Sequence, residues 1–151
     1  NTYASVPMQI IHSGNKPVFI DMEWIGHYFL YPTPILDSAC RFNKGMYIQN
    51  SFQILSFHHR KILNIGKGGM ILTNDKNFVN WSRPMIYDGR HIDKMYNEDE
   101  LECIGYHMYM TPEDADRGIK IFKTLDNYNE DCGSWQTYKD LTQQKIFKSY
   151  I

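Results

Sequence analysis

Four short apolar runs, separated by polar segments, dominate the hydrophobic pattern of the chain. They cover residues 17–21, 34–37, 52–57 and 69–73. The first two runs each end in an aspartate, as buried parallel strands do where they meet a site. The last two flank a polar, glycine-rich bend, the kind of connection with which α/β proteins present chemistry at the edge of a sheet. The pattern therefore predicts four strands.

Three other segments have apolar residues at helical spacing. Residues 3–11 form the first, and a Ser-Gly pair follows it and predicts its end. The second begins at Asn74-Asp75 and extends to residue 84. The third has Thr111 as a predicted N-cap and a proline at its first position, and its apolar face extends to Leu125.

Alternating strands and helices predict an α/β fold, with a mostly parallel sheet and flanking helices. We expect a single domain over residues 1–151, although residues 129–151 carry no clear pattern, and we expect a mobile charged loop at 88–102. Residues 22–33 do not fit this prediction, because a parallel crossover needs about a dozen residues and is usually a helix, and this segment has no clear pattern. Either the strands ending at Asp21 and Asp37 are not neighbours, or a segment is missing between them.

The composition is that of a globular protein with little net charge. Hydrophobic residues make up 42% of the chain, and 16 basic against 17 acidic residues give a net charge of −1. This balance argues against a nucleic-acid or anionic-membrane partner, and no apolar run approaches a membrane span. Cys40, Cys103 and Cys132 are widely spaced and form no C-x-x-C pair, so we expect free thiols in a reducing cytoplasm.

The polar bend contains a lysine in a basic setting. Lys61 follows Arg60, and the other bases near it are His58, His59 and Lys67. Neighbouring positive charge and desolvation lower the pKa of a lysine, which favours Schiff-base formation with an aldehyde. Ser56 and the glycine N–H groups are candidate phosphate donors, and Asp37 is a candidate partner for a protonated ring nitrogen. Together these groups describe a site for pyridoxal phosphate.

Simpler interpretations exist for each group. Lys61 is also compatible with a solvated loop lysine, Asp37 with a strand end or helix cap, and Ser56 with an ordinary strand-end hydroxyl. The Gly66–Gly69 segment is not a Walker loop, because a strand follows it instead of a helix. We expect no metal site at His58 and His59, since adjacent residues of a strand point to opposite faces.

Several blocks in order along the chain resemble one family. Ser56-Phe-His-x-x-Lys61, then Gly66-x-Gly-Gly69 and Thr73-Asn-Asp75, is similar to the lysine motif of the DegT/DnrJ/EryC1/StrS aminotransferases. The segments 14–21, 34–39 and 104–111 resemble further blocks of that family. These are fold-type I pyridoxal-phosphate enzymes that aminate nucleotide-linked keto-sugars, with glutamate as the expected donor.

The resemblance implies a role for each matching residue. Lys61 would form the Schiff base with the cofactor and shuttle the proton, and Asp37 would pair with the pyridine nitrogen. Ser56 would bind the cofactor phosphate. Cys40 would lie near the ring, and His58 would line the site. His107 stands where the family has an asparagine that reaches the phosphate of a neighbouring subunit, which implies a homodimer.

The chain also departs from the family pattern. Cys40 replaces Gln or His, His107 replaces Asn, Tyr109 replaces Arg, and Lys67 replaces Glu. The chain begins without Met and is much shorter than the family's, so we expect a piece of something longer. Three hypotheses stay open: part of the large domain of a sugar aminotransferase, a shortened non-catalytic relative with a binding or structural role, and an unrelated α/β phosphate-binding module.

Overall fold

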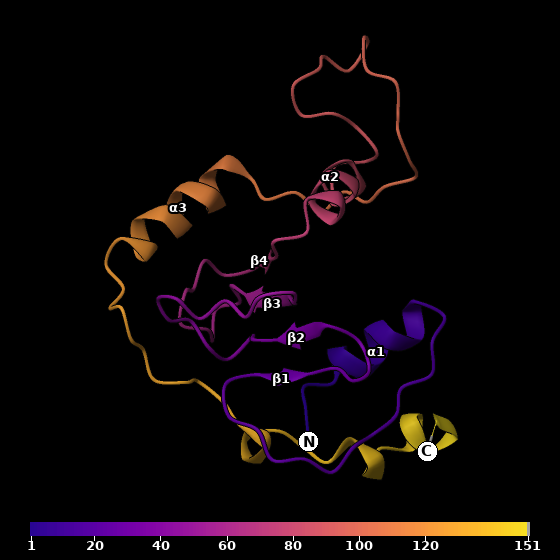
Figure 1. The fold of residues 1–151 in the computed structure, drawn as a ribbon, viewed down its shortest axis with the longest axis vertical. Helices are drawn as coiled ribbons and strands as arrows, with labels where there is room; N and C mark the ends of the chain where they lie inside the picture. The colour runs from indigo at the N-terminus through magenta and orange to yellow at the C-terminus, as the bar shows by residue number, and fades with distance from the viewer. Residues whose placement is uncertain (151) are drawn as a thin grey trace.

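A four-stranded sheet organises the protein, as the computed structural model shows for residues 1–150 (Figure 1). Its strands are β1 (Tyr28–Phe29), β2 (Ile35–Asp37), β3 (Phe52–Ser56) and β4 (Gly69–Leu72), and they lie side by side in that order. Only the central pair, β2 and β3, is parallel; β1–β2 and β3–β4 are antiparallel. The prediction of an α/β protein is confirmed, but the prediction of a mostly parallel sheet is wrong.

The lengths of the connections explain this mixed sheet. Residues 30–34 form a short turn between β1 and β2, and a turn of that length can only join antiparallel neighbours. The polar bend at 57–68 likewise folds back on itself and returns β4 alongside β3. The longer 38–51 segment permits the parallel β2–β3 pair.

The expected strand at 17–21 does not form. This segment pairs with no strand, and its apolar side chains Val18 and Ile20 are exposed. On the side away from β3, the strand next to β2 is β1, which lies inside the 22–33 segment that had no clear pattern. The strands proposed to end at Asp21 and Asp37 are therefore not neighbours, and the sheet needs no helix between them.

All three predicted helices are present. They are α1 (Ser5–His12), α2 (Lys76–Met85) and α3 (Pro112–Phe122). The predicted caps form, because Asp75 Oδ1 accepts from Phe78 N at 3.0 Å and Thr111 Oγ1 accepts from Asp114 N at 3.2 Å. Residues 88–102 form no helix or strand, in agreement with the predicted loop.

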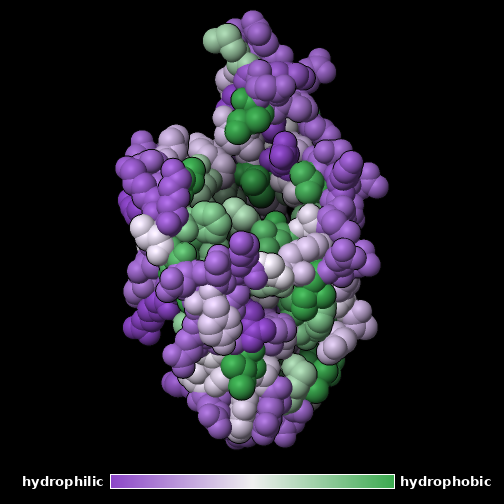
Figure 2. All heavy atoms as spheres, turned by 60° about the vertical axis from the view of Figure 1, so that its left-hand side comes forward, coloured by the Kyte–Doolittle hydropathy of each residue, from purple (hydrophilic) through white to green (hydrophobic). Residues whose placement is uncertain are grey.

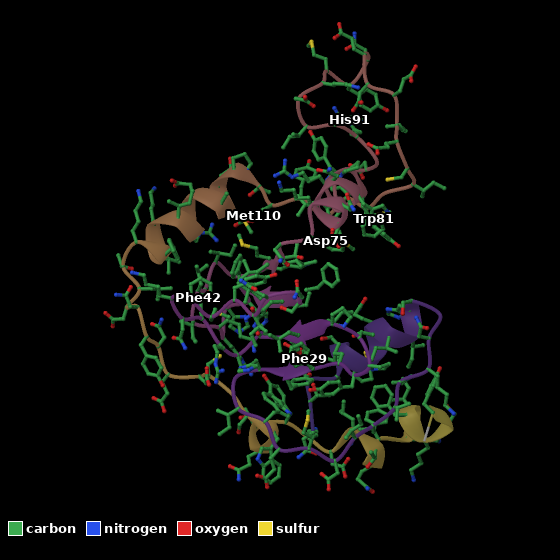
Figure 3. The ribbon with its side chains drawn as sticks, in the orientation of Figure 1. Phe29, Phe42, Asp75, Trp81, His91 and Met110 are labelled. Carbon is green, nitrogen blue, oxygen red and sulfur yellow. The ribbon has the colours of Figure 1, made fainter. Side chains whose placement is uncertain are left out.

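The main core lies between the sheet and α3. Its buried members are Leu55, Phe57, Leu63 and Ile65. The core remains open on one side, where a groove of about 830 Å³ runs between α3 and the sheet. Figure 2 shows apolar side chains gathered in a hollow on this side of the molecule, and Phe42 and Met110, labelled in Figure 3, line the groove.

The C-terminal segment runs back beneath β1, along the side of the sheet opposite α2 and α3 (Figure 1). It contains three short 3-10 helices, η1 (Trp135–Thr137), η2 (Leu141–Gln143) and η3 (Lys145–Tyr150). Phe147 is 1% exposed and packs edge-on against Phe19, with ring centroids 5.7 Å apart. Within residues 1–150, no helix is both long and apolar enough to cross a membrane.

Candidate functional site

The carboxyl ends of β2 and β3 bring the candidate residues to one edge of the sheet. Because these two strands are parallel, Asp37 at the end of β2 and Ser56 at the end of β3 face the same edge. The segments that follow the two strands meet there. Lys61 Nζ lies 3.2 Å from Cys40 Sγ.

Hydrogen bonds hold the Cys40 segment from both sides. The buried Gln53 side chain donates to Ser38 Oγ at 2.9 Å, which fixes the start of the segment against β3. On the other side, Arg41 Nε donates to Asp131 Oδ1 at 2.9 Å. Cys132 N then donates to Cys40 O, also at 2.9 Å. Cys40 is therefore fixed between β3 and a loop more than ninety residues further along the chain.

The bend after β3 is closed by its own backbone. His59 N donates to Gly66 O at 3.0 Å, and Lys61 N donates to His58 O at 2.8 Å. Gly68 has a φ of +133°, and a Cβ on Gly69 would lie 2.5 Å from Leu55 O. These two positions therefore require glycine, the first for its backbone angle and the second for close strand approach. The closed bend directs the Lys61 side chain back toward Cys40.

An aromatic cluster links Lys61 to Asp37. Tyr138 OH lies 3.3 Å from Lys61 Nζ and 3.2 Å from Cys40 Sγ. The Trp24 ring stacks on Tyr138, with centroids 5.7 Å apart, and packs on Tyr28 at 4.7 Å. Tyr28 OH donates to Asp37 Oδ2 at 3.0 Å. The three rings thus form a continuous wall between the carboxylate and the lysine.

The electrostatics of the cluster favour a thiolate. The Cys132 thiol, the Tyr138 hydroxyl and the Lys61 ammonium outweigh burial and lower the pKa of Cys40 to about 6. Hydrogen bonding to Cys40 and burial raise the pKa of Cys132, so Cys132 holds the proton of this pair. Burial, followed by the hydrogen bond to Cys40, raises the pKa of Tyr138 to about 12.

The predicted lowering of the Lys61 pKa is wrong in this structure. Desolvation does lower the pKa of Lys61, but attraction and hydrogen bonding to Cys40 and Tyr138 raise it overall. His58, His59 and Arg60 are exposed, whereas Lys61 is half-buried, and the groups that raise its pKa are Cys40 and Tyr138 instead of these neighbouring bases. Lys61 is therefore held as an ammonium by a nearby thiolate.

The groups nearest to Lys61 in sequence lie at the surface of the bend. Ser56 Oγ accepts from His58 N at 3.4 Å, so the two residues are joined at the start of the bend. Desolvation and the charges of His59, Arg60 and Lys61 lower the pKa of His58. The rings of His58 and His59 lie 4.0 Å apart, because these residues follow the strand instead of continuing it. The premise that they face opposite ways is thus wrong.

His107 lies outside the cluster. It belongs to the segment between α2 and α3, where its Nδ1 is 2.7 Å from Asp88 Oδ2 and its ring packs on Tyr109. Its side chain is 73% exposed. A residue that reaches into a neighbouring subunit has to lie at the surface, as His107 does. The role of His107 at a subunit interface stays a prediction.

The donor set of this sheet edge fits pyridoxal phosphate in its chemistry. Lys61 supplies an amine, Asp37 a carboxylate, and Ser56 with the glycine bend supplies hydroxyl and amide donors. The space between Asp37 and Lys61 is the obstacle, because the side chains of Trp24 and Tyr138 would contact a cofactor ring placed there. The residues therefore fit the cofactor if Tyr138 moves away from Lys61.

The sequence did not predict that the aromatic wall and Cys132 lie at this site. Tyr138 and Cys132 come from the C-terminal part of the chain, which has no hydrophobic period to place it. Trp24 and Tyr28 lie in the segment that had no clear pattern. The only available signal was the abundance of aromatic residues, with 11 Tyr and 3 Trp, and abundance does not locate a contact.

A family model matches about two thirds of the chain. The sequence model of the DegT/DnrJ/EryC1/StrS aminotransferase family matches residues 45–145. The matched region includes Ser56, Lys61 and His107, whereas Asp37 and Cys40 precede it. No curated protein matches the chain.

Proposed function

The chain belongs to the DegT/DnrJ/EryC1/StrS aminotransferase family, and on that premise we propose that its sheet edge is a pyridoxal-phosphate site for sugar amination. The amino donor would be glutamate, and the acceptor a nucleotide-linked keto-sugar. Two copies of the chain would form the working unit, with His107 reaching into the neighbouring site. The family is pyridoxal-phosphate dependent in general, which supports the cofactor.

The observation that carries this proposal is the meeting of Lys61 and the carboxyl ends of β2 and β3. Lys61 would hold the cofactor covalently, and Asp37 would bind its ring nitrogen. Ser56 and the glycine bend would bind its phosphate, with Cys40 and His58 beside the ring. When bound, the cofactor supplies an electron sink for amino transfer. Lys61 would also be the base that moves the proton.

Tyr138 and Trp24 would serve as the cover of this site. In the structure Tyr138 holds both Lys61 and Cys40, and Trp24 stacks behind it. To admit the cofactor, the Tyr138 hydroxyl would move away from Lys61, and Trp24 would line the site behind it. The aromatic wall would then shield the reacting atoms from water.

A second candidate function has a specific observation in its favour. The Lys61 ammonium is paired with a thiolate, and Asp37 already accepts a hydrogen bond from Tyr28. A non-catalytic relative that keeps the fold and acts as a binding or structural protein would have its former cofactor site filled in this way. The two candidates differ in one property, namely whether Lys61 reacts with the cofactor.

The experiment measures amino transfer by the purified chain. The protein is incubated with pyridoxal phosphate and glutamate, and 2-oxoglutarate release is followed with a panel of nucleotide-linked keto-sugars as acceptors. We expect release that depends on an acceptor and is lost in Lys61→Ala. Lys67→Ala is the matched control, because Lys67 lies in the same bend but is exposed. Absence of release with every acceptor would contradict the enzyme proposal and favour the non-catalytic relative.

A further inference from the structure

We propose that Cys40 and Cys132 form a peroxide-sensitive disulfide beside Lys61. The site consists of a buried cysteine that contacts the candidate cofactor lysine and an exposed cysteine held next to it by the backbone. The reactant would be hydrogen peroxide or a small hydroperoxide. In the structure both cysteines are free thiols, so this is the reduced form of the pair.

A backbone hydrogen bond holds the two cysteines next to each other. Cys132 N donates to Cys40 O at 2.9 Å. The two side chains also hydrogen-bond to each other, and a disulfide accepts Cα separations of about 4.4–6.8 Å. The next residue confirms the close approach, because a Cβ on Gly133 would lie 2.9 Å from Cys40 Sγ. Closing the bond therefore requires side-chain rotation and little backbone movement.

The loop that carries Cys132 is anchored, so the approach is maintained. Arg41, next to Cys40, pairs with Asp131, next to Cys132. A Cβ on Gly26 would collide with the Asp131 carboxylate, so the chain is tightly packed around this ion pair. The pairing thus holds the two cysteine segments in register.

Cys132 gives a small oxidant a route to the buried sulfur. Cys40 is 4% exposed, whereas Cys132 is exposed and lines a surface hollow of about 440 Å³ together with Ile25, Asp131 and Thr137. A peroxide molecule that enters this hollow meets the Cys132 side first. The third cysteine, Cys103, lies in the segment between α2 and α3, where its backbone lies against Gly89.

The reaction balances in two steps. The Cys40 thiolate, favoured by the Lys61 ammonium at 3.2 Å, attacks one peroxide oxygen, and the O–O bond breaks to give a sulfenic acid and hydroxide. Cys132 then loses its proton to hydroxide and attacks the Cys40 sulfur, which forms the S–S bond and expels a second hydroxide. Two electrons pass from the two sulfurs to the peroxide.

Oxidation would also change the charge of Lys61, and this consequence rests on the proposed function. The disulfide removes the thiolate that raises the Lys61 pKa, while desolvation, which lowers that pKa, remains. A larger fraction of Lys61 would be a neutral amine at pH 8. Each unit of lowered pKa makes that fraction about tenfold larger, so the oxidised chain would react faster with an aldehyde.

The test maps disulfides in the full chain after exposure to hydrogen peroxide. Reduced protein is titrated with peroxide, free thiols are blocked, and peptides are identified by mass spectrometry. We expect a Cys40–Cys132 linkage that reverses with dithiothreitol and forms equally in Cys103→Ser. In Cys132→Ser we expect Cys40 to stop at the sulfenic acid, which dimedone traps. Absence of the linkage in the wild-type chain would overturn the inference, whether or not the variants fold.

A second measurement separates this inference from the proposed function. Reduced and oxidised protein are each treated with pyridoxal phosphate and borohydride, and the adduct on Lys61 is quantified. We expect at least about tenfold faster modification after oxidation, for a pKa lowered by one unit or more. A linkage without any Lys61 adduct in either form would contradict the cofactor site alone. An adduct that forms at equal rates in the two forms would contradict the coupling to Lys61.

Discussion

Replacing Cys40 by serine removes the thiolate next to Lys61 and is expected to lower the pKa of that lysine. At 3.2 Å, a unit charge pair is worth about 1.3 kcal/mol in water and about 5 kcal/mol at the effective dielectric of a protein surface. Because Lys61 is only half-buried, we take a value of about 1–3 kcal/mol within this range. The pKa of Lys61 therefore falls in Cys40→Ser, and at about 1.4 kcal/mol per tenfold change its neutral fraction near pH 8 rises by roughly tenfold or more.

The assay is the pH dependence of Lys61 modification. Pyridoxal phosphate and cyanoborohydride are added over a range of pH, and the modified peptide is quantified against an unmodified one. We expect the midpoint of the profile to move to lower pH in Cys40→Ser, with roughly tenfold or more modification at pH 8. Because the pKa of Cys40 is about 6, the two profiles should converge below that pH, where the thiol is neutral. Identical midpoints above pH 7 would refute the thiolate–ammonium pair, and Cys103→Ser serves as the control that should not move.

Three further results are expected from the same geometry. Tyr138→Phe removes a hydrogen bond to the Cys40 thiolate that is worth about 1.5–3 kcal/mol, so the pKa of Cys40 should rise by about one unit or more. The rate of iodoacetamide alkylation against pH measures this pKa, and an unchanged value would contradict the contact. Cys40 is stabilised as a thiolate with a pKa lowered from its ordinary value near 9 to about 6, so its contribution to folding is full above pH 9 and is lost as pH falls to 6. In urea unfolding, the stability advantage of wild type over Cys40→Ser should therefore grow from pH 6 to 9, and a constant difference would be evidence against it. Phe147→Ala empties a site that is 1% exposed and should cost about 3–5 kcal/mol of unfolding free energy, whereas Ile146→Ala, 65% exposed, should change it by less than about 0.5 kcal/mol.

Local signals along the chain predicted the elements of the fold but not the pairing of its strands. Asp75 and Thr111 cap helices α2 and α3 as predicted, because capping depends only on neighbouring residues. The strands β3 and β4 were likewise visible as apolar runs. The direction of pairing depends on which segments lie side by side, and β1, only two residues long, left no detectable period. The apolar residues 17–21 failed as a strand because no partner strand lies beside them.

In the candidate site, too, local features were predictable from the sequence and long-range contacts were not. Asp37, Ser56 and Lys61 could be named as candidates because strand ends and a glycine bend have recognisable sequence features. The pKa of Lys61 could not be inferred from its sequence neighbours, since the groups that set it, Cys40 and Tyr138, lie far from it along the chain. Long-range contacts of this kind leave no trace in spacing or composition. The charge of a buried group therefore has to be read from the folded chain.

The most direct test of the cofactor site is to locate the attachment point of pyridoxal phosphate. The purified chain is incubated with the cofactor, reduced with borohydride, digested and mapped by mass spectrometry. The site described above predicts one dominant adduct, on Lys61, with no more than trace labelling of exposed lysines such as Lys67. Labelling spread over the exposed lysines, with Lys61 unmodified, would contradict it.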